Sequence, residues 1–215
     1  QEQFSVLVGS AASVKPGESL CGDHHLVMPL RDGKFLLAIS DGMGSGPEAA
    51  EESGAVIALL GSFLSAGFDK NAAIRLINSA LLLRGGEEMF ATVDMAILDL
   101  FSGNAEFVKI GSADSYLKSG KTVEVIPSTS LPVGIIDAPD IEHTRRRLRS
   151  GDLLVLASDG VAEAFGGSEG LLDRIKKLKQ DKSPKRLARE LLDEARQKET
   201  PYPDDMTLIL AQITA

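Results

Sequence analysis

Short apolar runs joined by tight-turn signals constrain the fold of this 215-residue chain more than any other feature. Antiparallel strands can be joined by two-residue turns, whereas parallel strands need a long crossover, usually a helix. The sequence therefore predicts antiparallel hairpins rather than a Rossmann-like parallel sheet. The expected pairs are 25–30 with 35–40 around Asp32-Gly33, 91–100 with 105–110 around Ser102-Gly103, and 116–118 with 122–126 around Ser119-Gly120.

The remaining pattern adds strands and the helices that would cover them. Residues 142–148 and 152–157 flank a turn signal at Ser150-Gly151, and further strands are expected at 4–8 and 206–213. Apolar residues at helical spacing, with Pro47 in the first turn and Asp69 as a cap, predict helices at 47–64, 69–83, 170–179 and 183–198. We therefore expect an α+β fold, with two stacked antiparallel sheets flanked by helices.

Composition limits the classes of function and the organisation of the chain. The hydrophobic content of 43% suffices for one large core, so residues 1–215 are expected to form a single domain; because the chain starts at Gln1, we expect a fragment of a longer chain. A net charge of −8, with no Trp and two Tyr, argues against nucleic-acid binding. The single Cys21 fits a cytoplasmic location. No apolar run reaches a spanning length, so no membrane contact is expected from this domain, although the full-length protein could be tethered elsewhere.

Aspartates stand where apolar strands begin or end. Asp41 follows the run 35–40, Asp159 follows 153–158, and Asp204 and Asp205 precede 206–210. Asp23 precedes the strand near residue 25. Carboxylates that converge at strand ends repel one another unless they are protonated or bound to a cation. Oxygen ligands without cysteine favour hard ions such as magnesium or manganese.

Other chemistries fit the residues less well. Asp32-Gly33 is a plain hairpin turn, but Asp41-Gly42 and Asp159-Gly160 are each followed by helix-like sequence, so a hairpin does not account for them. The glycine-rich loop 41–47 could cradle a phosphate, yet it has Pro47 where a dinucleotide fingerprint needs glycine and lacks the Gly-Lys-Ser/Thr of a P-loop. Cys21 has no arginine six positions later, and no histidine has a metal-like spacing with another.

Six motifs in this order resemble the protein phosphatase 2C superfamily, in its bacterial branch. The segments with Gly44-Ser45-Gly46 and 49–53 are similar to the subgroup that acts in sporulation. The motifs are Gly22-Asp23, Ser40-Asp41-Gly42-Met43-Gly44-Ser45-Gly46, Ala91-Thr92-Val93-Asp94-Met95-Ala96, Ser130-Leu131-Pro132-Val133-Gly134-Ile135, Ser158-Asp159-Gly160-Val161 and Asp204-Asp205-Met206-Thr207.

The resemblance implies an αββα sandwich that binds two Mn²⁺ or Mg²⁺ ions. Asp41 would match the bridging ligand, and the Gly42 carbonyl would face the second metal. Asp159 and Asp204 would match ligands of the first metal, so Asp41, Asp159 and Asp204 are the expected catalytic residues. Asp23 would match the acidic residue near the second metal, and Asp205 stands where many relatives have Asn, which suggests a supporting position.

The implied activity is that of a metal-dependent protein serine/threonine phosphatase. Two-metal activation of water would hydrolyse a phosphoserine on an anti-sigma-factor antagonist, which is the implied partner, and sporulation gene control would follow. Eukaryotic members of the superfamily have a His where Met43 stands, so the leaving-group acid is unassigned, with metal-bound water or His24 as candidates. The alternative is a binding module that keeps the fold without turnover and docks a phosphoprotein.

Two further segments have open interpretations. The resemblance implies that helices 47–83 act as a switch, since Asp41-Gly42 leads into them; a fixed helical layer is the alternative. Their apolar stretches could form a homodimer surface. The basic run Arg145-Arg146-Arg147 with Arg149 could dock an acidic partner, or it is the solvated face of a strand.

Overall fold

The computed structural model describes residues 2–44, 46–83, 90–198 and 203–215, and it contains two five-stranded sheets. Every strand pairing within them is antiparallel. The first sheet has the order β1 (Ser5–Ser13), β10 (Met206–Thr214), β9 (Leu153–Ala157), β6 (Ser115–Ser119) and β7 (Thr122–Ile126). The second sheet has the order β2 (Asp23–Pro29), β3 (Lys34–Asp41), β4 (Val93–Asp99), β5 (Asn104–Ile110) and β8 (Glu142–Arg147).

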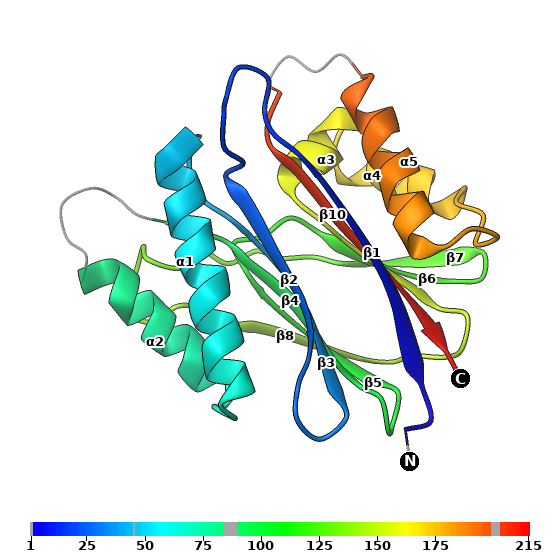
Figure 1. Cartoon of the computed structure of the whole chain (residues 1–215), viewed down its shortest axis with the longest axis horizontal. Coiled ribbons are helices and arrows are strands. Elements are labelled where there is room, and N and C mark those ends of the chain that lie inside the picture. The colour runs from blue at the N-terminus through cyan, green and yellow to red at the C-terminus, as the bar shows by residue number, and fades with distance from the viewer. Residues whose placement is uncertain (1, 45, 84–89, 199–202) are drawn as a thin grey trace.

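Helices cover the outer faces of both sheets, which confirms the expected αββα arrangement (Figure 1). Helices α1 (Gly46–Ser65) and α2 (Lys70–Leu83) pack on the second sheet. Helices α3 (Asp159–Ala164), α4 (Ser168–Lys176) and α5 (Pro184–Arg196) pack on the first. Asp69 caps α2 as predicted, because its Oδ1 accepts hydrogen bonds from the backbone N–H groups of Asn71 and Ala72.

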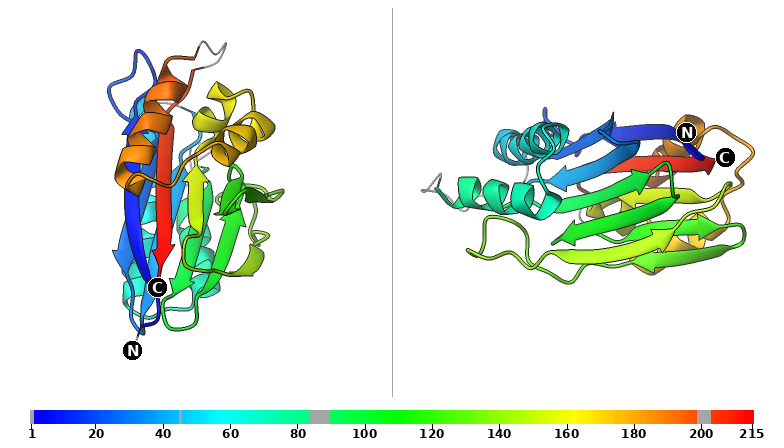
Figure 2. Two further views of the ribbon diagram at one scale, coloured as in Figure 1. Left: turned by 90° about the vertical axis from the view of Figure 1, so that its right-hand side faces the viewer. Right: turned by 90° about the horizontal axis from the view of Figure 1, so that it is seen from below.

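Strand periodicity divides the apolar residues into three layers. In β3, Leu37 and Ile39 face the other sheet, whereas Leu36 and Ala38 face α1 and α2. Figure 2 shows the two sheets stacked face to face between the helical layers. Complete burial of a Leu or Ile side chain contributes roughly 1.5–3 kcal/mol, so the three layers hold the sandwich together. The polar ends of the inner-facing strands are where the candidate site lies.

One expected strand pair is not a pair. The turn at Ser150-Gly151 connects β8 to β9, but β8 pairs with β5 in the second sheet, whereas β9 pairs with β10 and β6 in the first. The turn therefore carries the chain from one sheet to the other. A local turn signal reports a reversal of direction; which strands then pair depends on which faces are apolar. The α3 segment begins directly at Asp159, in agreement with the helix-like sequence after it.

No helix within the described ranges is long and apolar enough to cross a bilayer. Ser45, which belongs to the motif 40–46, lies outside the described residues. The predicted helix ends at 179 and 198 extend slightly past the observed ends of α4 and α5.

Candidate metal centre

The apolar layer between the sheets ends in carboxylates. Asp23, the first residue of β2, lies directly opposite Asp41, the last residue of β3. Both follow the inward-facing alternation of their strands, as Ile39 and Val27 do. The two strand termini therefore bring two acidic side chains to one end of the sandwich, as the sequence predicted.

Thr92 fixes the backbone at Asp41. The Thr92 hydroxyl accepts a hydrogen bond from the Asp41 N–H (3.0 Å), and the Thr92 N–H donates to the Asp41 carbonyl (2.8 Å). Ser40 Oγ donates to the Thr92 carbonyl at 2.7 Å. Three hydrogen bonds thus hold the end of β3 against the segment that precedes β4. Thr92 belongs to the motif 91–96, but its spacing alone predicted no role for it.

Two glycines are required by close backbone packing rather than by turns. A Cβ on Gly42 would lie 2.1 Å from the carbonyl oxygen of Ala49, in the first turns of α1. A Cβ on Gly160 would lie 2.2 Å from the carbonyl oxygen of Asp205. Real Cβ atoms do not approach so closely, so only glycine fits at either position. The distinction drawn between these Asp-Gly pairs and hairpin turns is therefore confirmed.

The first sheet supplies the other aspartates. Asp159 opens α3 after β9, and Asp204 is the second residue before β10. Asp204 Oδ1 lies 3.9 Å from Lys15 Nζ. Asp205 has a different environment: its two carboxylate oxygens accept 2.7 Å hydrogen bonds from the backbone N–H groups of Lys15 and Gly22. Asp205 therefore anchors the segment that leads from β1 into β2, and hence Asp23.

Mutual repulsion and burial shift the acidity of the cluster. Burial, together with the charges of Asp23, Asp159 and Asp204, raises the pKa of Asp41 to about 9. Burial also raises the pKa of Asp23 to about 6, although the neighbouring hydroxyls of Ser158 and Thr207 oppose the rise. Burial and the charge of Asp204 raise the pKa of Asp159. Each of these carboxylates is thus costly to ionise in the absence of a cation.

The donors suit a hard divalent cation. Both oxygens of Asp23 are buried and make no hydrogen bond of normal geometry, although the Ser158 and Thr207 hydroxyls lie nearby; this is expensive for a carboxylate unless something else supplies positive charge. Within the described ranges, no three His, Cys, Asp or Glu side chains form a complete ligand cluster. Mg²⁺ keeps most of its water and needs only one or two carboxylates, so an open arrangement of this kind fits it. A cavity of about 240 Å³ borders Asp41 and Asp159.

A buried ion pair, which the sequence interpretation missed, lies beside this cavity. Lys109 Nζ is 2.9 Å from Asp94 Oδ1 and donates a 2.8 Å hydrogen bond to Ser115 Oγ. Ser115 Oγ donates to Asp94 Oδ2 at 2.6 Å. The three side chains join β4 and β5 of the second sheet to β6 of the first. Asp94 lies directly opposite Lys109 in the β4–β5 hairpin, and this opposition of unlike charges is the feature of the sequence that could have indicated the pair.

His24 and Cys21 do not join the cluster. His24 Nδ1 lies 2.8 Å from Ser53 Oγ on α1, so its ring points to the face of β2 opposite Asp23. This geometry does not favour His24 as the leaving-group acid. Burial raises the pKa of Cys21 to about 12, which makes its thiol a poor nucleophile.

Known proteins with this fold define its class. The chain superimposes with a TM-score of 0.89 on the structure of the PP2C phosphatase domain with a fragment of the regulatory domain of SpoIIE from Bacillus subtilis, at 36% identity, covering 100% of this chain and 64% of that one. RsbX in complex with magnesium has the same fold, at 20% identity with a TM-score of 0.74, each chain covered fully. The fold is thus that of a PP2C-type phosphatase domain, and phosphatases of this class are hydrolases.

The family follows from the sequence matches. The Stage II sporulation protein E (SpoIIE) family model matches residues 31–214. Stage II sporulation protein E of Bacillus subtilis (strain 168) is 36% identical over 217 residues, which cover 99% of this chain and 26% of that protein. The chain belongs to the SpoIIE family and spans about a quarter of the length of this relative.

Proposed function

We propose that residues 1–215 form one phosphatase domain, which hydrolyses a phosphoserine on an anti-sigma-factor antagonist protein in a metal-dependent reaction. The observation that carries the proposal is the convergence of aspartates from both sheets at one end of the inter-sheet layer. Their raised pKa values and the buried oxygens of Asp23, which make no hydrogen bond of normal geometry, are the expected properties of a cation site. Membership of the SpoIIE family supports phosphoserine as the substrate group.

Mn²⁺ or Mg²⁺, as two ions, would be held by Asp41, Asp159 and Asp204, with the Gly42 carbonyl and Asp23 nearby. When bound, the ions supply positive charge that activates water and neutralises charge on the phosphoryl group. The magnesium in the RsbX structure supports the choice of a hard divalent ion. For Asp205 we propose a positioning role near the metals, because both its oxygens already accept backbone hydrogen bonds.

The chain itself contributes preorganisation. Thr92 holds the backbone of Asp41, and Asp205 holds the segment before Asp23, so the carboxylates are fixed before substrate arrives. The close contact of Gly160 with Asp205 ties the α3 end of the site to the β10 end. Fixed carboxylates cost little reorganisation when charge develops on phosphorus.

The proposed partner is the phosphorylated anti-sigma-factor antagonist, and the proposed setting is sporulation gene control in the cytoplasm. Family membership supports the setting, and the single Cys21, with no second cysteine in the sequence, fits a reducing compartment. The net charge of −8 supports a protein partner over nucleic acid.

Helices α1 and α2 are a proposed switch for the site. The backbone of Gly42 touches Ala49 in α1, so a shift of α1 would move the Gly42 carbonyl. Leu76 and Leu83 on α2 are exposed and could contribute to a homodimer contact. Hydrogen exchange in residues 47–83 should respond to added Mn²⁺; unchanged exchange with metal and with an upstream regulatory segment would contradict the switch.

Turnover of p-nitrophenyl phosphate and of a phosphoserine protein, with and without Mn²⁺, tests the proposal. Wild-type turnover should require Mn²⁺, and Asp41→Asn and Asp159→Asn should each abolish it. Asp181→Asn is the matched control, because Asp181 is exposed. Metal-dependent turnover that survives Asp41→Asn would reject the assignment.

A further inference from the structure

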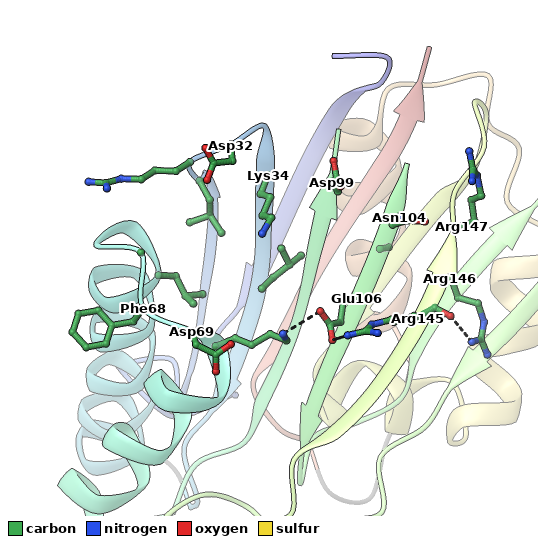
Figure 3. Close-up of a pocket in the computed structure, with 17 residues that line it drawn as sticks. Asp32, Lys34, Phe68, Asp69, Asp99, Asn104, Glu106, Arg145, Arg146 and Arg147 are labelled. Atoms are coloured by element: carbon green, nitrogen blue, oxygen red, sulfur yellow. Dashed lines mark hydrogen bonds and ion pairs between the residues drawn. The ribbon is translucent and has the colours of Figure 1, made fainter. Parts of the chain in front are cut away.

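A second cavity lies far from the aspartates of the candidate metal centre. This groove, of about 720 Å³, runs over the outer face of the second sheet at the end where β3 begins (Figure 3). Lys34 lines the groove and Asp41 lies at the other end of the same strand. Seven residue steps of about 3.3 Å separate them by roughly 23 Å. The groove is therefore a separate surface from the metal centre.

Uncovered sheet forms the floor of the groove. Helix α1 ends and helix α2 begins at the edge of the groove, so half-buried Ile97 of β4 lines it directly. The wall is the α1–α2 connection, where Phe68 is 48% exposed. A concave surface with an apolar floor and an exposed aromatic ring is typical of a binding site.

The basic run splits between two faces. Arg145 and Arg147 point out over the groove, and Arg145 is 80% exposed at its side chain. Arg146 has its Nε 2.7 Å from Glu124 Oε1 of β7, so it closes the edge between the two sheets. The strand alternation thus directs two of the three arginines over the groove, whereas the third binds Glu124 of the other sheet.

Most acidic residues of the groove already form hydrogen bonds or ion pairs within the domain. Asp69 caps α2, and Asp99 accepts hydrogen bonds from the backbone N–H groups of Phe101 and Ser102 in the β4–β5 turn. Glu106 lies 3.2 Å from Lys70 and 3.3 Å from Arg145. Asp32 is an exposed residue of the β2–β3 turn, with φ of 58°. The carboxylates therefore leave part of the positive charge unmatched.

Two of the basic side chains that line the groove make no such contacts within the described residues. Six basic and four acidic residues line the groove, in a chain whose net charge is −8. Among the described residues, the side chains of Arg31 and Arg147 make no hydrogen bond or ion pair within 4 Å, and both residues are exposed, whereas the charge of exposed Lys34 acts on Asp99. A local surplus of free cations on an acidic protein is a specific electrostatic feature, and it attracts anionic partners.

We infer that this groove binds an acidic peptide segment of a partner protein. Carboxylates of the segment would pair with Arg145, Arg147 and Arg31, while an apolar residue would pack on Phe68 and Ile97. Arginine binds carboxylates in a bidentate manner, and an exposed aromatic side chain elsewhere in the lining can supply an apolar anchor. The site is independent of turnover, since it lies at the opposite end of β3 from the metal centre.

A labelled eight-residue peptide of glutamates with one central Phe tests the inference, and its Gln counterpart is the charge control. Fluorescence anisotropy at low salt should show binding of the Glu peptide only, and binding should weaken as salt is raised. Arg145→Glu with Arg147→Glu should weaken binding at least tenfold. Arg189→Glu with Lys179→Glu, exposed residues outside the groove, carries the same charge change and should leave binding within twofold.

Each outcome of these measurements assigns an occupant to the groove or rejects the acidic peptide. Equal loss in both double variants, or binding of the Gln peptide as tight as the Glu peptide, would overturn the inference. A dimer in sedimentation that dissociates on Arg145→Glu with Arg147→Glu would assign the groove to a second copy instead. Binding to anionic phosphatidylserine vesicles without peptide binding would assign it to a membrane. Phe68→Ala, expected to weaken peptide binding about fivefold, gives an answer even if the charge variants misfold.

Discussion

Gly160 packs so closely against Asp205 that a Cβ at residue 160 would meet the Asp205 carbonyl oxygen at 2.2 Å. The contact joins α3 to the segment before β10, and Asp159 and Asp204 are next to it in sequence. The spacing of two proposed ligands therefore depends on the absence of one methyl group.

Gly160→Ala should destabilise the domain by about 1–3 kcal/mol, because the new methyl group must displace backbone rather than a flexible side chain. Metal-dependent turnover should fall with it. Gly54→Ala on α1 is the matched control, since its Cβ would sit at an ordinary 3.4 Å from His24 and alanine favours the helix. Chemical denaturation measures both, and equal stability of the two variants would contradict the importance of this packing.

The acidity of Asp41 predicts how the metal-free domain responds to pH. Its folded pKa of about 9 lies above the ordinary value of 3.8, so the folded state holds a proton that the unfolded state has released. The stability from this group is complete below about pH 4 and is lost as pH rises towards 9. In EDTA, the free energy of unfolding should fall by on the order of 1 kcal/mol per pH unit between pH 6 and 8.

Asp41→Asn should flatten this slope, because an amide does not titrate, whereas exposed Asp181→Asn should keep it. Saturating Mn²⁺ should also flatten it in the wild type, since the cation replaces the proton. Urea titrations at each pH, in EDTA and in Mn²⁺, supply the comparison. A wild-type domain that gains stability from pH 6 to 8 in EDTA would count against the buried, protonated carboxyl group.

Neighbouring Asp204 and Asp205 should respond differently to substitution. Asp205→Ala leaves the N–H groups of Lys15 and Gly22 without their acceptor, and should cost about 1–3 kcal/mol of stability in EDTA. Asp204→Ala should leave the stability in EDTA nearly unchanged but remove much of the rise in melting temperature that Mn²⁺ gives. Thermal unfolding with and without Mn²⁺ distinguishes the two variants. If Asp205→Ala instead removed the rise in melting temperature and Asp204→Ala did not, Asp205 would be a direct ligand.

Lys109 is predicted to contribute strongly to stability because it neutralises the buried carboxylate of Asp94. Lys109→Met leaves the carboxylate of Asp94 buried without its cation, which should cost about 3–5 kcal/mol. Adding Asp94→Leu to that variant should recover much of the loss. Lys176→Met, which breaks the exposed pair with Asp173, should leave the stability close to that of the wild type. Urea unfolding of these variants beside the wild type tests this; a double variant no more stable than Lys109→Met would refute the buried-charge penalty.

Local patterns predicted the fold well where pairing is local. The turns at Asp32-Gly33, Ser102-Gly103 and Ser119-Gly120 each join strands that do pair. The turn at Ser150-Gly151 has the same signal but joins two sheets, because β8 and β9 find partners far away in the chain. Such a choice depends on the complementarity of whole faces, which a local motif does not contain.

Part of the candidate site was visible in the sequence for the same reason. Asp23, Asp41, Asp159 and Asp204 were recognisable because each marks the end of an apolar strand. Thr92 and Asp205 act through backbone hydrogen bonds to segments distant in sequence, and no spacing rule reveals those. The outward direction of Arg145 and Arg147 required the register of β8, and the groove required the ends of α1 and α2.

The pairing of β1 with β10 has a consequence for the order of folding. Ser5 lies opposite Thr214, so the two most distant strands of the chain are neighbours in the first sheet. During synthesis, about two hundred residues must be added after β1 before its partner β10 is available. Asp204 and Asp205 stand just before that last strand. The acidic cluster is thus completed only when the final strand docks, and a nascent chain has no assembled site until then.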